Sequence, residues 1–146
     1  MTKVIDKFKG DYAFLSNFEP CKVSFNGRMY RTVEHAFQAA KSLDMVEQKL
    51  FQFVGDPGEA KKWGRQIKLR PDWETVKESI MKDLLRQKFT QEKFKKLLLE
   101  TCDATIIEGN NHKDTYWGVY KGTGKNRLGE LIMEVRKEIK EKENRI

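Results

Sequence analysis

Apolar side chains recur at steps of three and four residues along much of this chain, which is the spacing of one face of an α-helix. Over residues 72–89 they are Trp73, Val76, Ile80 and Leu84. Pro71 fits directly before such a helix, because proline is tolerated at a helix start. The same spacing predicts further helices over residues 33–44, 58–69, 91–101 and from Leu128 onward. The fold must therefore pack several helical faces around a core.

Strand signals are fewer. The Asn26-Gly27 pair lies between two short runs with strand character in residues 21–30, and this pattern predicts a β-hairpin. Residues 104–108 are typical of a short strand. We therefore predict an α+β fold, a mainly helical single domain over residues 1–146 with a small N-terminal β-hairpin and minor strands. We expect the charged segment from about residue 137 to 146 to be a frayed or solvated tail.

The composition limits the environment and the cofactors. A chain of 146 residues with 38% hydrophobic content can bury a core. It has no apolar run typical of a signal peptide or a membrane span, so we expect a cytoplasmic protein. The cysteines, Cys21 and Cys102, and the histidines, His35 and His112, form no metal-binding spacing. We therefore expect free thiols, no metal and no cofactor.

Positive charge is concentrated in one part of the sequence. The net charge is +7, and residues 61–100 hold twelve Lys or Arg against six Asp or Glu. This excess favours a partner that carries phosphate. A lysine-rich solvated face is the alternative interpretation.

The segment before the last predicted helix carries more polar detail than packing needs. Asp114, Trp117 and Gly118 lie in it, and Glu108 precedes it. The tryptophan offers a stacking surface, and glycine lets the backbone approach a ligand. The helix that begins after Asn126 offers free N–H groups to a phosphate. The alternative is a Gly-rich loop around a buried tryptophan.

A second candidate lies in the helix predicted over residues 33–44, which Thr32 can cap. Glu34, Gln38 and Lys41 share one face of this helix. They can provide an acid or base, an orienting amide and a cation along one cleft wall. The same stripe can also be the wet side of an amphipathic helix. Asn17, in the segment 14–20, either contacts substrate or satisfies a turn.

Several chemistries are not indicated. The sequence has no Walker loop, no GxSxG elbow and no GxGxxG after a predicted strand. Carboxylates beside lysines and tryptophans remain. Hydrolysis of a glycosidic bond fits this inventory best, because its transition state is cationic at the sugar carbon.

With these residues laid out, the chain resembles the NADAR family, also called YbiA-like proteins. The matching segments are "GDYAFLSNFEP", "FNGRMYRTVEHAFQAAKSLD", "GEAKKWGRQIKLRPDWETVKESIMKDLLRQKF", "LLLETCDATIIEGNNHKDTYWG" and "GKNRLGELIMEVR". They cover nearly the whole chain in the family's order. The resemblance implies hydrolysis of N-glycosidic bonds, either in phosphorylated riboflavin precursors or between ADP-ribose and guanine.

The resemblance also implies roles for individual residues. Glu34 is similar to the family's essential carboxylate, and Asp114 and Trp117 to its second acid and stacking wall. Lys41, Trp63, Lys82 and Lys88 lie in or beside matching segments. The chain departs from the family at Val119-Tyr120, where a small residue is expected, and at Glu92, where asparagine is common. A side chain as large as that of Tyr120 narrows or reshapes the expected pocket and so affects which substrate it accepts.

We predict an N-glycosidase that removes ADP-ribose from guanine, free or in nucleic acid. The predicted catalytic residues are Glu34, Asp114 and Lys41. Substrate contacts are predicted for Asn17, Gln38, Trp63, Lys82, Lys88, Glu108, Trp117, Gly118 and Asn126. A Schiff base at Lys41 or Lys82 is an alternative route.

Three other readings stay open. The first is a hydrolase of the ribosylaminouracil phosphate of riboflavin synthesis. The second is a non-catalytic reader of ADP-ribose or nucleic acid, and the third is an interaction domain without a small-molecule site.

Overall fold

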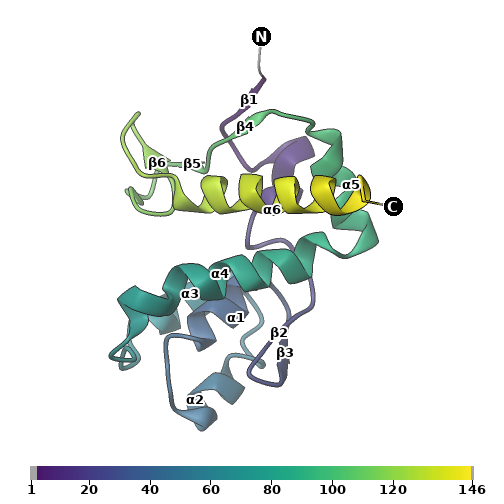
Figure 1. The fold of residues 1–146 in the computed structure, drawn as a ribbon. Helices are drawn as coiled ribbons and strands as arrows, with labels where there is room; N and C mark the ends of the chain where they lie inside the picture. The colour runs from purple at the N-terminus through teal and green to yellow at the C-terminus, as the bar shows by residue number, and fades with distance from the viewer. Residues whose placement is uncertain (1–2, 146) are drawn as a thin grey trace. The chain divides into compact units, whose positions relative to one another are not determined.

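The structure is a computed structural model that describes residues 3–145. The chain forms two compact units, one from residues 3–16 and 89–145 and the other from residues 17–88. Each unit combines helices with short strands (Figure 1). The predicted α+β class, mainly helical with minor strands, is confirmed. The prediction of a single domain over residues 1–146 stays a prediction.

The unit of residues 17–88 contains a β-hairpin and four helices. In chain order they are β2 (Val23–Phe25), β3 (Arg28–Tyr30), α1 (Val33–Ala39), α2 (Met45–Leu50), α3 (Pro57–Gly64) and α4 (Trp73–Phe89). Helix α4 continues one residue beyond this unit. The core of the unit is formed mainly by Val23, Tyr30, Val33, Phe37, Phe51, Trp73 and Leu84.

The hairpin forms at the predicted place. Strands β2 and β3 are antiparallel, with Val23 opposite Tyr30. Asn26 and Gly27 connect them with φ values of 52° and 77°. Both values lie in the left-handed region that a tight two-residue hairpin turn requires, which is why an Asn-Gly pair occurs there.

Helix α1 packs against α3 and the hairpin. The Thr32 hydroxyl caps it by accepting a hydrogen bond from the His35 N–H at 3.0 Å, as predicted. The helix ends at Ala39, so the predicted range 33–44 was too long. The Lys41 carbonyl accepts a hydrogen bond from the Arg70 N–H at 2.8 Å, which holds the chain directly after the helix.

Two further helices start at aspartates. Helix α2 was not predicted, and Asp44 caps it by accepting hydrogen bonds from the N–H groups of Val46 and Glu47. Helix α3 begins with Pro57 after the cap residue Asp56. It ends at Gly64, so the prediction over residues 58–69 was also too long.

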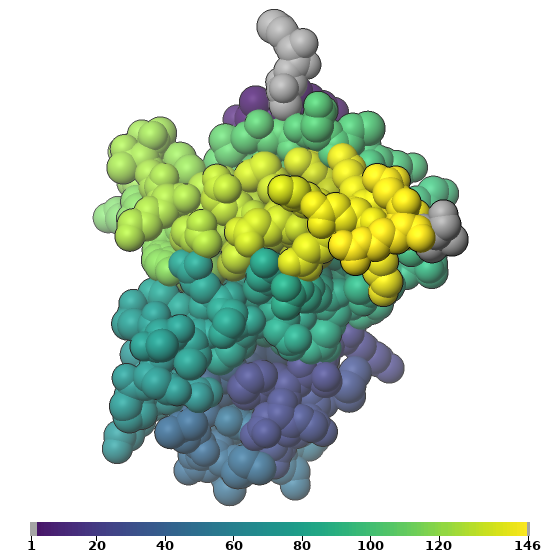
Figure 2. Space-filling model, viewed as in Figure 1, coloured from purple at the N-terminus to yellow at the C-terminus, as the bar shows by residue number. Residues whose placement is uncertain are grey.

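The other unit combines short strands with two longer helices. Its elements are β1 (Val4–Ile5), the 3-10 helix η1 (Gly10–Leu15), α5 (Glu92–Glu100), β4 (Thr105–Ile106), β5 (Gly109–Asn110), β6 (Val119–Tyr120) and α6 (Arg127–Glu143). Strand β1 pairs in parallel with β4, the short strand predicted within residues 104–108. Strands β5 and β6 also pair in parallel. Helix α6 packs on β4 and α5 and lies along one face of this unit (Figures 1 and 2).

Helix α6 is longer than predicted. Its predicted apolar face is confirmed, because Leu128, Leu131, Ile132 and Val135 are all buried. The segment 137–143, expected to belong to a solvated tail, continues the helix to Glu143. Buried Ile139 extends the same face, so this part of the tail has a packing partner.

Candidate functional site

Helix α1 is buried on every side. All seven of its residues are buried, and the side chains include Glu34, 7% exposed, and Gln38, 4% exposed. The interpretation of these two residues as the wet side of an amphipathic helix was therefore wrong. Because a carboxylate loses hydration free energy when it is buried, it needs polar partners. The buried carboxylate of Glu34 therefore needs hydrogen-bond donors or cations close to it.

Gln38 is one such partner. Its Nε2 donates a hydrogen bond to Glu34 Oε2 at 3.1 Å, across one turn of the helix. The backbone N–H of Glu34 donates to the carbonyl of Asn17 at 3.1 Å. These contacts fix both the backbone and the carboxylate of Glu34. They also join Asn17 to the start of α1, which sequence patterns alone did not indicate.

Two amide oxygens near Glu34 stand out. Asn17 Oδ1 and Gln38 Oε1 are buried and, within residues 3–145, have no hydrogen-bond partner. A buried acceptor without a donor costs about 1–3 kcal/mol. Such atoms suit a ligand that brings N–H or O–H donors, as the hydroxyls of ribose and the amino groups of a base do.

Lys41 lies close to Glu34 in an otherwise positive environment. Burial lowers the pKa of the Lys41 ammonium, and the positive charges of Arg65 and Lys61 lower it further. The Glu34 carboxylate acts in the opposite direction and raises the pKa. Lys41, Lys61 and Arg65 therefore form a group of cations beside the carboxylate. Such a group can bind phosphate, and a lysine with a lowered pKa is a better nucleophile.

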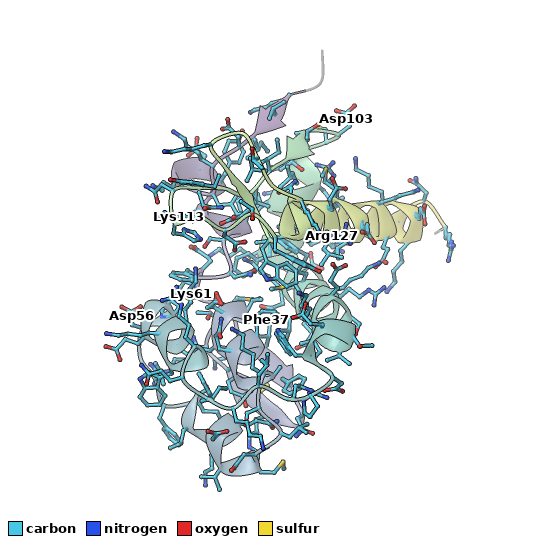
Figure 3. All side chains as sticks on the ribbon, turned by 90° about the vertical axis from the view of Figure 1, so that its left-hand side faces the viewer. Phe37, Asp56, Lys61, Asp103, Lys113 and Arg127 are labelled. Carbon is cyan, nitrogen blue, oxygen red and sulfur yellow. The ribbon has the colours of Figure 1, made fainter. Side chains whose placement is uncertain are left out.

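The remaining predicted residues of this unit lie on α3 and α4. Trp63 is 40% exposed and contacts Phe51 edge-on, with ring centroids 6.1 Å apart. Figure 3 shows Phe37 of α1 inside the unit, whereas Asp56 and Lys61, at the start of α3 and within it, lie at its edge. Lys82 is half-buried on α4.

Lys88, near the end of α4, is a different kind of lysine. It is fully buried, and burial lowers the pKa of its ammonium to about 8, while Cys21 and Glu19 act to raise it. Its predicted contact with substrate stays a prediction.

In the other unit, Asp114 shapes the loop that carries Trp117. Its Oδ1 accepts hydrogen bonds from the N–H groups of Tyr116 at 3.0 Å and Trp117 at 2.9 Å. The Trp117 ring is half-buried and packs on the ring of Tyr116, with centroids 4.9 Å apart. Asp114 thus holds the backbone of the tryptophan in place.

Asn110 organises this loop and was missed in the sequence. Its Nδ2 donates to Glu108 Oε2 and to the Asp114 carbonyl, both at 3.0 Å. Its Oδ1 accepts from the N–H of Asp114 at 3.1 Å. One carboxamide therefore connects the two predicted acids of this unit. Its surroundings, "GNNHKD", are rich in residues common in loops, so no sequence pattern distinguishes it from its neighbours.

Gly118 makes room for one of these acids. A Cβ atom at this position would lie 1.8 Å from Glu108 Oε2 and 2.2 Å from the Glu108 carbonyl oxygen. Such distances are far inside van der Waals contact, so only glycine fits here. The structure therefore explains this glycine by its contact with Glu108, and a contact with substrate stays a prediction.

The start of α6 uses two of its first N–H groups within the fold. The N–H of Arg127 donates to the Tyr116 carbonyl at 3.0 Å, and that of Leu128 to the Trp117 carbonyl at 2.9 Å. Asn126 Oδ1 accepts from the Glu108 N–H, and its Nδ2 donates to the Ile106 carbonyl, both at 2.9 Å. The N–H groups of Arg127 and Leu128 are therefore already bonded, and the Asn126 side chain serves the fold. Its predicted contact with substrate stays a prediction.

The described part of the chain contains neither a candidate metal cluster nor a candidate membrane-spanning helix. Within residues 3–145, no three His, Cys, Asp or Glu side chains are grouped so that they could hold a metal ion. Both cysteines are free thiols. No helix in that range is long and apolar enough to cross a bilayer.

The candidate residues thus form two local groups. Glu34, Gln38 and Lys41 lie together in the unit of residues 17–88, with Asn17 bonded to the backbone of Glu34. Glu108, Asp114, Trp117 and Gly118 lie together in the other unit. That both groups act on one substrate stays a prediction.

Comparison with known proteins identifies the class. The NADAR domain matches residues 5–140 of the chain. The chain therefore belongs to the NADAR family, as its motifs predict.

Its relatives include proteins named as N-glycosidases. N-glycosidase YbiA of Escherichia coli is 41% identical over 133 residues, which are 88% of this chain and 82% of YbiA. An N-glycosidase of Nostoc punctiforme is 35% identical over 147 residues, 96% of this chain and 94% of that protein. The prediction that this chain is an enzyme, an N-glycosidase, is confirmed.

A solved structure supports the same assignment. The NMR structure of E. coli YbiA matches with a TM-score of 0.85 and 37% identity, over 98% of this chain and 89% of that one.

A riboflavin biosynthesis protein of Vibrio vulnificus is 33% identical over 135 residues. Those residues are 90% of this chain and 36% of the Vibrio protein, which therefore contains further sequence.

Proposed function

We propose that this N-glycosidase hydrolyses the bond between the anomeric carbon of a ribose and a ring nitrogen of a base. The observation that carries the proposal is the Glu34 carboxylate, buried in α1 and hydrogen-bonded by Gln38. Cleavage of a glycosidic bond develops positive charge at the sugar carbon. A carboxylate fixed in a low-dielectric environment stabilises that charge or removes a proton from the attacking water.

The other candidates take complementary roles. Asp114 supplies the proton that the base needs when it leaves, and Trp117 stacks on the base. Asn17 Oδ1 and Gln38 Oε1, the two buried acceptors, receive hydrogen bonds from substrate donors. The water oxygen ends on the sugar carbon, and the base departs with the proton.

For the substrate, we propose an ADP-ribose joined to guanine, free or within nucleic acid. The group of Lys41, Lys61 and Arg65 beside Glu34 suits a diphosphate, which carries two negative charges near the ribose. Exposed cations such as Lys62, Lys68 and Lys93 provide further attraction for a polyanion.

A second substrate is favoured by a separate observation. Relatives of Vibrio vulnificus and Zea mays are named riboflavin biosynthesis proteins. The phosphorylated ribosylaminouracil of that synthesis has the same type of bond and one phosphate. It would use the same carboxylate and fewer of the cations.

The test is a chromatographic assay of both substrates side by side. Purified protein is incubated with an ADP-ribosylated guanine oligonucleotide and with ribosylaminouracil phosphate, and the released sugar phosphate is measured. We expect release of ADP-ribose from the oligonucleotide. Cleavage of the aminouracil substrate alone would replace the first substrate with the second. Binding of the oligonucleotide without cleavage of either substrate would favour a non-catalytic reader. Filter binding of the oligonucleotide at increasing salt concentrations measures that binding and its salt dependence.

A further inference from the structure

We propose that Gly64 is a positioning residue for Glu34, because its missing side chain leaves the space that the Gln38 carboxamide occupies. The inference rests on the proposed role of Glu34. It connects the last residue of α3 with the hydrogen bond inside α1, two helices that pack side by side (Figure 1).

While Gln38 keeps its position, the space at residue 64 admits no Cβ atom. A Cβ atom at position 64 would lie 1.8 Å from Gln38 Oε1, 2.7 Å from Gln38 Cδ and 3.3 Å from Gln38 Cβ. The first two distances are well below van der Waals contact. Gly64 itself is buried, so an added methyl group cannot turn into solvent.

Local backbone conformation does not explain this glycine. Gly64 is not among the glycines with positive φ, and Arg65, which follows it, has right-handed φ and ψ of −79° and −14°. Glycine is an unfavourable residue in a helix, and alanine at the same position would favour α3. The contact with Gln38 is therefore the physical reason for glycine here.

The Gln38 carboxamide depends on this contact. Its Nε2 is bonded to Glu34, whereas its Oε1 is buried without a hydrogen-bond partner within residues 3–145. No hydrogen bond at the oxygen therefore holds the amide plane, and packing against Gly64 takes that part. In Gly64→Ala we expect the carboxamide of Gln38 to move, because it is the flexible end of a side chain and moves more easily than the α3 backbone. The hydrogen bond to Glu34 is then lost or lengthened.

The first test measures this geometry without any substrate. In ¹⁵N-labelled protein, the side-chain amide signals of Gln38 are assigned by their loss in Gln38→Ala. We expect these signals to shift in Gly64→Ala and to exchange faster with water. Gly55→Ala is the matched control, because a Cβ at Gly55 meets nothing within 4 Å. Unchanged Gln38 signals in Gly64→Ala would overturn the inference, even if the enzyme acts on neither proposed substrate.

The second test measures the consequence for catalysis. We expect Gly64→Ala to lower kcat about tenfold or more, the usual range for loss of a hydrogen bond to a charged group, with a melting temperature close to wild type. In the Gln38→Ala background the same glycine substitution should have no further effect on kcat. An equal loss in both backgrounds would show that Gly64 acts by another route. Inactive wild-type protein with shifted Gln38 signals in Gly64→Ala would contradict the proposed function alone.

Discussion

Gln38 Nε2 donates a hydrogen bond to Glu34 Oε2 at 3.1 Å within a helix whose residues are all buried. On a helix surface, a pair four residues apart contributes only about 0.2–0.5 kcal/mol. The same pair in a buried helix has a larger effect, because the low dielectric strengthens a bond to a charged acceptor. Carboxylates are rarely buried for stability alone. This pair is therefore the feature of the molecule that points most directly to chemistry.

Replacing Trp117 tests the stacking role of its loop. Trp117→Ala should raise KM about tenfold, because a base stacked on an aromatic ring contributes about 1–3 kcal/mol, and should change kcat less. Trp117→Phe, which retains a ring, should recover most of the loss. Steady-state kinetics on the cleaved substrate measure both constants. An unchanged KM in Trp117→Ala would remove the stacking claim.

The sequence predicted those elements that depend on neighbouring residues. The Asn26-Gly27 turn, the Thr32 cap and the apolar face of α6 are each set by residues within a few positions, and each is confirmed. Residues that meet from distant segments could not be predicted in this way. The Arg70 N–H, for example, donates to the carbonyl of Lys41, a residue 29 positions earlier in the chain, directly after α1 ends.

For the candidate site, too, the local features could be predicted from the sequence and the contacts between distant segments could not. The spacing of Glu34 and Gln38 predicted their shared helix face, but not that the helix is buried on all sides. Burial depends on what packs around the helix, and one-dimensional periodicity carries no such information. The roles of Asn110 and Gly64 depend on their contacts with particular side chains, and no local sequence pattern predicts those contacts.

Lys88 should reduce stability at neutral pH. Its pKa is lowered from 10.5 to about 8 by burial, so the unfolded chain binds the proton more tightly. Stability therefore rises as the pH increases from about 8 to 10.5. Lys88→Met should raise the unfolding free energy at pH 7 by about 1–3 kcal/mol, and the gain should disappear at high pH. Urea unfolding at pH 7 and pH 10 measures this, with exposed Lys93→Met as the control. A less stable Lys88→Met protein at pH 7 would contradict the prediction.

His35 should make the fold sensitive to mild acid. Its Nε2 lies 2.7 Å from the Val54 carbonyl, which can only accept, so Nε2 carries the proton and Nδ1 accepts from the Thr32 hydroxyl at 2.8 Å. Burial lowers the pKa of His35 below 6.5. The unfolded state then binds more protons, so the contribution of His35 is complete above pH 6.5 and is lost as the pH falls below it.

The measurement is the unfolding free energy between pH 7.5 and 5.5. The loss due to His35 can reach about 1.4 kcal/mol per pH unit at most. His35→Gln should show a smaller loss over this range than wild type, and His112→Asn, at an exposed position, should retain the wild-type loss. Equal slopes for wild type and His35→Gln would exclude His35 as the cause.

Lys41 has the properties of a lysine that forms a Schiff base, since burial and nearby cations lower its pKa. In the covalent route, its Nζ forms an imine with the anomeric carbon of ring-opened ribose as the base leaves. Borohydride then reduces the imine to a stable amine. By this alternative route, mass spectrometry would find the sugar adduct on the peptide with Lys41 and none in Lys41→Arg, whereas the direct attack of water proposed above leaves no adduct. Turnover without an adduct would support direct attack by water, and an adduct at Lys82 would assign the step to that residue.

The central claim is that Glu34 is the carboxylate that drives cleavage, and single-turnover rates of Glu34→Gln test it most directly. This variant retains the shape of the side chain and removes its charge. Glu59→Gln, at an exposed position in α3 of the same unit, is the matched control. We predict a rate lowered about 10²- to 10⁴-fold for Glu34→Gln, as for other catalytic acids and bases, and a wild-type rate for Glu59→Gln. A Glu34→Gln protein that cleaves substrate within a few-fold of wild type would contradict the account.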